Sequence, residues 1–377
     1  MTQTMEQQMD WMNDAYSQAL IKINRLNEKI GASFPHVCLD GNYNCEDASF
    51  WTSGFWGGLL WLAYRETKEE ALRETAELIE QQLNVPLQQF YDIHHDVGFM
   101  YLPTSVINYQ LSGNEESRRM GLIAASHLAG RFNLSGQFIR AWTDRVDPNS
   151  TGWAIIDCLM NLPLLFWASK EENDPRFKQI AIAHANTVLK QFVRDDWTVP
   201  HIVSFNPETG EKIENLGGQG LGPDSAWSRG QAWAIYGFAI AARETGDQAY
   251  VTASKNIANY FLSHLPEDKV PYWDFRTADK DKHVRDSTAA ACTASGLIEL
   301  SKLIEDETEA SFYYESAIAI LKGLYDNYAD FSDGQDAILT KGTVSYPVNR
   351  HVNVPIIYGD YYFLEALVKL RGQQGLF

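Results

Sequence analysis

One two-part unit recurs along the chain, and it constrains the fold more than any other feature of the sequence. Each copy opens with an apolar, aromatic segment such as "WTSGFWGGLLWLAYRE" or "WSRGQAWAIYGFAIAARET". A short polar turn follows, and then a segment such as "FKQIAIAHANTVL" with polar residues on one face. Both kinds of segment have the 3.6-residue periodicity of α-helices, so the sequence predicts a series of helix pairs.

The turns carry residues that begin helices. Asp174 in "ENDP" and Asp247 in "TGDQ" stand where an N-cap is expected, and Pro175 takes the first helical position. An opening helix over about Met5–Ile30 supplies the missing partner of the last unit, "YGDYYFLEALVKLRG". The sequence therefore predicts twelve helices in six pairs.

The two kinds of helix differ in polarity. The first member of each pair is apolar nearly all round and should be buried on every side, whereas the second has one polar face and should form an outer layer. A closed double ring meets both demands. An open superhelix would end in a polar capping repeat, which "YYFLEALVKL" is not. We predict an all-α fold, an (α/α)6 barrel formed by residues 1–377 as one catalytic domain, with an open superhelix as the alternative.

Two stretches break the helical pattern. Val199–Asn215 and Ala337–Val348 are typical of β-hairpins, the first with a glycine-containing turn and the second turning at Lys341 and Gly342. Both precede an inner helix, as do the connections rich in tryptophan, histidine and aspartate. These insertions should therefore collect at one rim of the ring, where functional loops usually lie.

Charge and composition exclude several classes of function. The chain has 31 basic and 49 acidic residues, a net charge of −18, and no basic cluster that could follow a phosphate backbone, so no nucleic-acid partner is expected. No apolar run is as long as a membrane span. The N-terminal residues lack the pattern of a secretory signal, and the four cysteines contain no C-x-x-C, so we expect a cytoplasmic protein. The oligomeric state is left open, with a monomer favoured.

The motif "HHD" presents either a metal site or a catalytic carboxylate. His94 and His95 are adjacent and should point in different directions, and no H-x-x-x-H or H-E-x-x-H occurs. We therefore expect no metal and no other cofactor. Asp96 is equally well explained as an N-cap or as a catalytic residue.

Asp157 is the sharper candidate. It is the only charged residue of the apolar run "WAIIDCLMNLPLLF", which we predict to be helical. An ionised carboxylate there is costly unless it is paired or faces a cavity. Asn161, one turn later, could hydrogen-bond to it, and a neutral structural aspartate is the alternative. We favour a functional aspartate, because the ring should enclose a central cavity that needs a polar floor.

A group of aromatic and polar residues surrounds these carboxylates in the predicted rim. Trp142 and Trp227 offer ring platforms, and Gln219, which lies between glycines, has no packing role to explain it. Arg229 opens a helix, where a cation is mildly unfavourable, so it serves either an anionic ligand or a salt bridge to an acid such as Asp224. Trp233 lies inside a helix, and core packing is a strong alternative for it.

Taken together, the motifs identify a family. "FWTSGFWGGLLWLAY", "HHDVGF", "IIDCLMNLPLL", "WSRGQAWAIYGFA", "YWDF", "RDSTAAACTASGL" and "GDYYFLEAL" follow one another as in the bacterial unsaturated glucuronyl hydrolases, glycoside hydrolase family 88. The chain resembles this family over nearly its whole length. The resemblance implies an (α/α)6 barrel, no metal, and a small oligosaccharide substrate that ends in a 4,5-unsaturated uronic acid.

The resemblance also implies a reaction and its residues. Members of the family hydrate the C4=C5 enol ether: an aspartic acid protonates C4, water adds at C5, and the hemiketal opens. Asp157 matches the acid and base, and Asp96 matches its assisting partner. Burial and a neighbouring carboxylate both raise a carboxyl pKa, as such an acid requires. The positions that match substrate contacts are Trp51, His95, Trp142, His201, Gln219, Trp227, Arg229, Trp233 and Tyr346.

One motif departs from the family pattern. Members that favour sulfated fragments have S-Y-H-S-x-K near the last hairpin, whereas Ser345–Arg350 is "SYPVNR" here. We therefore expect weaker preference for sulfated substrates. Three rival enzymes remain: an unsaturated rhamnogalacturonyl hydrolase, a glycosidase that hydrolyses an acetal with two carboxylates, and a sugar epimerase on a similar toroid.

Overall fold

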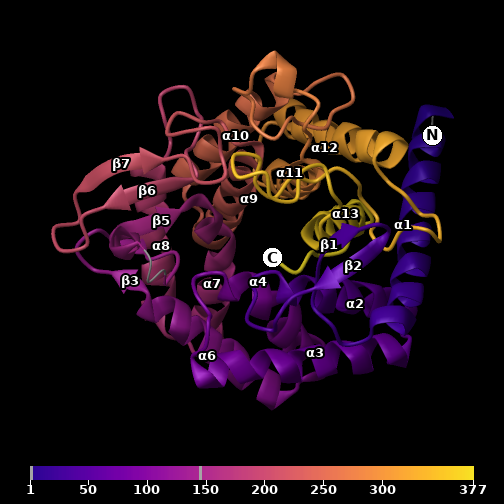
Figure 1. Ribbon diagram of the computed structural model, residues 1–377, viewed down its shortest axis with the longest axis horizontal. Helices are drawn as coiled ribbons and strands as arrows, with labels where there is room; N and C mark the ends of the chain where they lie inside the picture. The colour runs from indigo at the N-terminus through magenta and orange to yellow at the C-terminus, as the bar shows by residue number, and fades with distance from the viewer. Residues whose placement is uncertain (1–2, 144–146) are drawn as a thin grey trace.

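The computed structural model describes residues 3–143 and 147–377, whose helices form two concentric rings. The chain can be followed once around these rings in Figure 1, from indigo to yellow. The inner ring contains α2 (Ser53–Thr67), α4 (Val97–Tyr101), α5 (Ile107–Ser112), α7 (Leu162–Glu171), α9 (Ser228–Thr245), α11 (Ser287–Ser301) and α13 (Ile357–Leu370). The outer ring contains α1 (Gln3–Ile30), α3 (Glu70–Gln89), α6 (Glu115–Gly130), α8 (Pro175–Gln191), α10 (Gln248–Ser263) and α12 (Glu307–Asn327).

Helices α4 and α5 are two halves of one inner run, so the described residues contain the twelve helical runs that the repeat predicts. A π-helical turn, η1 (Leu102–Val106), joins the two halves. It contains Pro103, whose missing N–H cannot complete an α-helical hydrogen bond at that position.

Both rings are closed. Inner helix α13 packs against α11 on one side and against α2 on the other. In the outer ring, Tyr325 of α12 donates a hydrogen bond to Asp14 of α1 at 2.5 Å, and its ring lies 5.7 Å from that of Trp11. The predicted (α/α)6 barrel is confirmed, and the open superhelix is wrong.

The burial of each helix follows its sequence pattern. In α9, all residues from Ser228 to Ala242 are buried, as expected for a helix that is apolar nearly all round. In outer helix α8 the buried side chains recur at helical spacing on one face. The two predicted N-caps are confirmed, because Asp174 accepts a hydrogen bond from the Arg176 N–H and Asp247 from the Ala249 N–H.

Short antiparallel strands lie at one rim of the ring. The predicted hairpin over Val199–Asn215 is confirmed as β6 and β7, and a strand that was not predicted, β5, pairs with β6 on its other side. The strands are β1 (Pro35–Leu39), β2 (Asn42–Cys45), β3 (Phe132–Asn133), β4 (Phe138–Ile139), β5 (Trp153–Ile155), β6 (Ile202–Phe205) and β7 (Lys212–Leu216). The 3-10 helices are η2 (Pro148–Gly152), η3 (Ile156–Asn161) and η4 (Asp279–Asp281).

The second predicted hairpin is wrong in its position. The chain does not turn back at Lys341 and Gly342. Instead, Gly342 bridges Val354 and Ser345 bridges Arg350, so the turn lies further along the chain. Gly342 is not a turn residue: a Cβ there would lie 2.9 Å from the side chain of Ile356, so its small size allows close packing.

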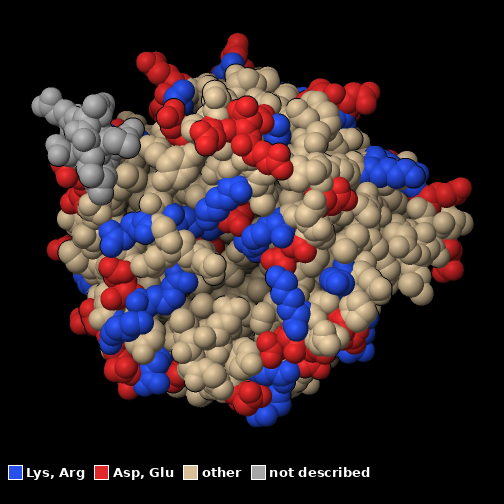
Figure 2. Space-filling view, turned by 180° about the vertical axis from the view of Figure 1, so that it is seen from behind, with Lys and Arg blue, Asp and Glu red and all other residues tan. Residues whose placement is uncertain are grey.

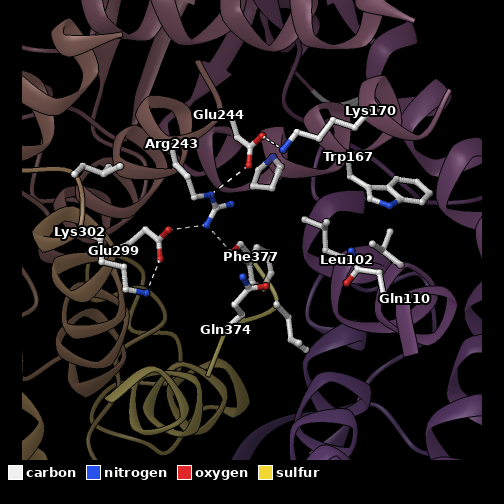
Figure 3. A pocket seen from close by; sticks show the side chains of 15 residues that line it. Leu102, Gln110, Trp167, Lys170, Arg243, Glu244, Glu299, Lys302, Gln374 and Phe377 are labelled. Atoms are coloured by element: carbon white, nitrogen blue, oxygen red, sulfur yellow. Dashed lines mark hydrogen bonds and ion pairs between the residues drawn. The ribbon is translucent and has the colours of Figure 1, made fainter. Parts of the chain in front are cut away.

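The end of the barrel opposite the strands contains a cavity that does not continue through the barrel. The face in Figure 2 has a hollow near its middle with lysine and arginine side chains around it. A cavity of about 650 Å³ lies between the C-terminal ends of the inner helices, and ion pairs cross it from Lys170 to Glu244 and from Arg243 to Glu299 (Figure 3). Phe377 closes its inner end.

Aromatic rings fill the barrel axis above this cavity. The ring centroid of Phe99 lies 5.9 Å from that of Phe377, 5.3 Å from that of Trp233 and 5.6 Å from that of Trp51. Phe99, Trp233 and Phe377 are buried, and Trp51 is half-buried at the strand-decorated rim. The barrel is therefore a cup that opens at one rim and not a tunnel.

The close packing of α2 against α4 at Gly54 predicts how much one added methyl group would lower the free energy of unfolding. A Cβ on Gly54 would lie 2.4 Å from the backbone oxygen of Phe99 and 2.6 Å from the Cα of Met100, so Gly54→Ala must push α2 and α4 apart. We expect Gly54→Ala to lower the free energy of unfolding by about 2 kcal/mol or more. Gly130→Ala, at a helical position with no atom within 4 Å, should be neutral or stabilising by up to about 1 kcal/mol. Denaturant unfolding of both variants measures this difference, and equal stability would contradict the packing argument.

Candidate active site

Two aspartates lie in neighbouring segments at the open rim. Asp157 is the second residue of η3, between β5 and α7, and Asp96 immediately precedes α4. The prediction that Asp157 lies in an α-helix is wrong, because α7 begins only at Leu162. Of the two alternatives for Asp96, the side-chain N-cap is wrong, since this side chain makes no capping hydrogen bond. Both side chains are largely buried, with exposed fractions of 9% and 6%.

Donors surround the Asp96 carboxylate. His95 Nε2 lies 3.0 Å from Asp96 Oδ1, and His94 Nδ1 lies 3.4 Å from Oδ2. Asn161 Nδ2 donates to Asp96 Oδ1 at 3.1 Å and to the backbone oxygen of Asp157 at 3.3 Å. Asn161 therefore bonds to the side chain of Asp96 and not, as expected from the sequence, to that of Asp157.

These surroundings give the two carboxyl groups opposite properties. Burial by itself would raise the pKa of Asp96, but its histidine neighbours and the Asn161 amide outweigh burial and hold this pKa below its ordinary value. Burial and then the charge of Asp96 raise the pKa of Asp157 to about 7, although His95 and Arg229 act in the opposite direction. Near neutral pH, the site therefore holds one ionised carboxylate beside one carboxyl group that keeps much of its proton.

The side chain of His201 also faces Asp157. His201 Nδ1 accepts a hydrogen bond from the backbone N–H of Gln219 at 2.9 Å. Burial, followed by the charge of Arg229, lowers the pKa of His201 to about 3, so the ring is neutral and carries its proton on Nε2. This Nε2 lies 3.5 Å from Asp157 Oδ1. Gly218 allows the approach of the loop, because its φ is +56° and a Cβ would lie 2.0 Å from His201 Nδ1.

Arg229 is buried, and both of its terminal nitrogens are engaged. Its Nη1 bonds to the Asp286 carboxylate and to the backbone oxygen of Thr343, and its Nη2 donates to Gln219 Oε1 at 2.6 Å and to the backbone oxygen of Val344 at 2.8 Å. The salt-bridge interpretation is therefore confirmed, with Asp286 as the partner in place of Asp224. Gln219 Oε1 already accepts a hydrogen bond from Arg229. The amide nitrogen of Gln219 is therefore the polar atom of this side chain that can face a ligand.

The aromatic candidates separate into two groups. Trp227 packs on His201 with ring centroids 4.6 Å apart, and half-buried Trp142 lies 6.0 Å from the same histidine, so both flank the carboxylates. Trp233 is fully buried on the barrel axis, as the packing alternative expects. Tyr346 is half-buried in the last hairpin, where its hydroxyl donates to Asp281 at 2.8 Å. The structure thus brings together Asp96, Asp157, His95, His201, Gln219, Arg229, Trp142 and Trp227. Trp51 and Trp233 are connected to this group through the ring of Tyr358, whereas the contacts of Tyr346 are with Trp273 and Asp281, outside the group.

The expectation that the adjacent histidines diverge is wrong. One nitrogen each of His94 and His95 and one oxygen of Asp96 lie within 4.8 Å of one another, and the two rings are tilted by only 35°. Both rings face the carboxylate and provide it with polar neighbours. The loop before α4 turns both side chains to the same side, which helical or strand geometry would not do.

Comparison with known proteins identifies the family. The sequence profile of Glycosyl Hydrolase Family 88 matches residues 22–374. The chain belongs to this family. It is 39% identical over 355 residues to the unsaturated glucuronyl hydrolase of Bacillus sp. (strain GL1), which covers 92% of this chain and 94% of that protein. It is 36% identical over 334 residues to the unsaturated chondroitin disaccharide hydrolase of Streptococcus pyogenes serotype M1, covering 88% and 83%.

Solved structures support the same assignment. The crystal structure of unsaturated glucuronyl hydrolase from Bacillus sp. GL1, described as responsible for the degradation of glycosaminoglycan, matches with a TM-score of 0.93 at 37% identity. The match covers 97% of this chain and 98% of that one. As a member of a glycoside hydrolase family, the chain is a glycosidase.

Sequence reasoning missed two residues that shape the site. Asp286, which pairs with Arg229, also caps α11 by accepting from the Thr288 N–H. An aspartate directly before an apolar helix was the available signal, but it indicates only a cap. Gly218 was one of several glycines in its loop, and nothing in the sequence distinguishes the one that lies against His201.

The raised pKa of Asp157 predicts a pH-dependent stability cost. Because the folded chain keeps its proton up to about pH 7 while an unfolded aspartate releases it near its ordinary pKa of 3.8, the stability contribution of this group falls as pH rises between these values. Asp157→Asn should remove that loss and become more stable than the wild type by on the order of 3 kcal/mol at pH 8.

Unfolding measured from pH 5 to pH 8 checks this prediction. Asp306→Asn, at an exposed helix cap where asparagine serves as well, is the matched control and should show no growing difference. A difference between Asp157→Asn and the wild type that stays constant across this range would contradict the assigned pKa.

Proposed function

We propose that the chain releases the terminal 4,5-unsaturated uronic acid from oligosaccharides produced by polysaccharide lyases, by hydrating the C4=C5 enol ether. The observation that carries the proposal is the pairing of ionised Asp96 with Asp157, whose pKa is about 7. Protonation of carbon at neutral pH needs a carboxyl group that still holds its proton. The names of the Bacillus and Streptococcus relatives support the same chemistry.

The proposed reaction uses the side chains of Asp157 and His201. Asp157 donates its proton to C4, and positive charge develops at C5 and the ring oxygen. His201 Nε2–H, 3.5 Å from Asp157 Oδ1, can then stabilise the carboxylate that forms. Asp157 takes a proton from the water that adds at C5, which restores the acid. The resulting hemiketal opens, and the glycosidic bond to the shortened sugar breaks.

The negative protein must hold a negatively charged sugar. Arg229 cannot donate freely through its Nη atoms, because four acceptors occupy them, but its hydrogen bond to Oε1 orients the side chain of Gln219. The Gln219 amide nitrogen supplies a donor, and Trp142 and Trp227 supply faces on which a sugar ring can stack. We assign substrate contact to these side chains, and the buried Trp233 to the wall behind them.

The cup shape supports action at a chain end. The axis is filled by Phe99 and Phe377, so no strand of polysaccharide can pass through the barrel. This arrangement supports the proposal that a terminal residue of the substrate reaches Asp157 from the rim that carries the strands.

The remaining expectations stay predictions. They include the single catalytic domain over residues 1–377, the monomeric state, the cytoplasmic location, and the absence of a metal, of another cofactor and of a nucleic-acid partner. No helix of the described residues is long and apolar enough to cross a membrane. Among the rival reactions, an epimerase would need two catalytic histidines in the cavity. His94 and His95 instead both direct a ring nitrogen toward the Asp96 carboxylate.

Substitution of the two aspartates tests the mechanism. Asp157→Asn keeps the side-chain shape but removes the proton donor and acceptor, so turnover should fall by roughly 10²–10⁴-fold or more. Asp96→Asn should also lower turnover, and because it removes the like charge that raises the Asp157 pKa, the alkaline limb of its pH profile should move to lower pH. Loss of the ultraviolet absorbance of the unsaturated disaccharide measures turnover. A folded Asp157→Asn variant with near-wild-type activity would refute the assignment.

The last hairpin predicts substrate preference. Ser345–Arg350 lacks the second serine of the family motif for sulfated substrates, so an unsulfated unsaturated disaccharide should have a higher kcat/KM than its sulfated counterpart. The combined variant Pro347→His, Val348→Ser and Arg350→Lys rebuilds that motif at an exposed turn, where Val348 is 70% exposed. It should shift the ratio toward the sulfated substrate. A wild type that prefers the sulfated disaccharide would overturn this prediction.

A further inference from the structure

Asn161 occupies the contact between the two catalytic segments. It is the last residue of η3, and its side chain is fully buried. Its Oδ1 accepts a hydrogen bond from the Phe99 N–H in α4 at 2.9 Å, while its Nδ2 donates to Asp96 Oδ1 at 3.1 Å and to the Asp157 backbone oxygen at 3.3 Å. One amide group therefore joins the segment that carries Asp96 to the segment that carries Asp157.

The surrounding backbone is shaped to admit this amide. A Cβ on Gly98 would lie 2.5 Å from Asn161 Oδ1 and 2.6 Å from its Cα, distances that real Cβ atoms essentially never show. The first turn of α4 can therefore approach η3 only because residue 98 has no side chain. Both polar ends of the amide are used, so its orientation is fixed by Phe99 on one side and by Asp96 on the other.

We infer that Asn161 is a positioning residue for the hydration reaction, which holds the Asp96 carboxylate in place beside Asp157. The inference rests on the proposed function of the two aspartates. Asn161 has no contact with a reacting atom and acts through Asp96. Its amide hydrogen bond favours the ionised form of Asp96, and that charge in turn keeps the proton on Asp157.

Other titratable groups also face Asp96 and must be considered in any pH effect. They are His94 and His95 beside it in the chain, Asp157 and Cys158 of η3, His201 before β6, and Arg131 after α6. His201 and His94 are neutral, since burial lowers the pKa of each to about 3. Among the groups that hydrogen-bond to Asp96, Asn161 is the one that comes from the segment of the catalytic acid.

Asn161→Asp tests the contribution of the hydrogen-bond donor separately from that of the rest of the Asn161 side chain. The variant keeps the shape and the acceptor for the Phe99 N–H, but it replaces the N–H donor that faces Asp96 with an oxygen. We expect kcat on the unsaturated disaccharide to fall roughly tenfold or more, with little change in KM, because the carboxylate is misplaced and not the substrate. The acidic limb of the pH profile, which requires ionised Asp96, should move to higher pH.

A matched control exists elsewhere in the barrel. Asn108 is also buried, and its Nδ2 donates to Glu80 Oε2 at 2.8 Å, so Asn108→Asp makes the same chemical change at a buried amide–carboxylate pair outside the site. It should lower thermal stability but leave kcat and both limbs of the pH profile unchanged. Asn161→Ala, which removes the donor without adding a charge, serves if Asn161→Asp does not fold, and it should move the acidic limb in the same direction.

The results separate this inference from the proposed function. If the wild type hydrates no unsaturated uronate, the proposed function fails. If the wild type is active but the Asn161 variants keep its kcat, or lose activity with an unmoved acidic limb as a merely destabilised enzyme would, the positioning role is wrong.

Discussion

The site depends on keeping two carboxyl groups close together in a buried environment while only one of them is charged. Two carboxylates cannot both ionise cheaply where the dielectric constant is low, so the first charge suppresses the second. Which group ionises is determined by the hydrogen bond that Asp96 receives from Asn161, whereas the buried Oδ1 of Asp157 has no hydrogen-bond partner and lies beside a neutral histidine. Acid catalysis at neutral pH is therefore produced by an uneven distribution of hydrogen-bond donors, and no unusual chemical group is required.

The double ring of helices makes that distribution rigid. The inner helices are buried on all sides, so their rim ends cannot shift without disturbing the packed aromatic axis. Close approach at Gly54, Gly98 and Gly218 places the backbone of one segment directly against the functional side chains or backbone of the next. Arg229 ties the last hairpin to α11 through Asp286 and Thr343, so its charge is fixed in place near the carboxylates.

The sequence predicted the rings well because helix periodicity and caps are local properties. It located Asp157 for a similar reason, since a single charge in an apolar run is visible without knowing the fold. It could not predict which groups meet across loops. The partner of Arg229 lies 57 residues away, and Asn161 bonds to a residue 65 positions away. The η3 turn and the shifted last hairpin were missed because contacts with β6 and Val354 override local preference there.

A cup with one mouth also determines the order in which products depart. In the proposed reaction, the uronate ring would bind deepest, toward the aromatic rings that fill the axis, and the rest of the oligosaccharide would lie toward solvent. After the bond breaks, the shortened sugar would block the exit and would have to leave first. The opened keto acid leaves second, and it can re-enter an empty enzyme in competition with fresh substrate. Slow disposal of that acid by the surrounding metabolism would therefore reduce the flux through the enzyme without any separate regulatory site.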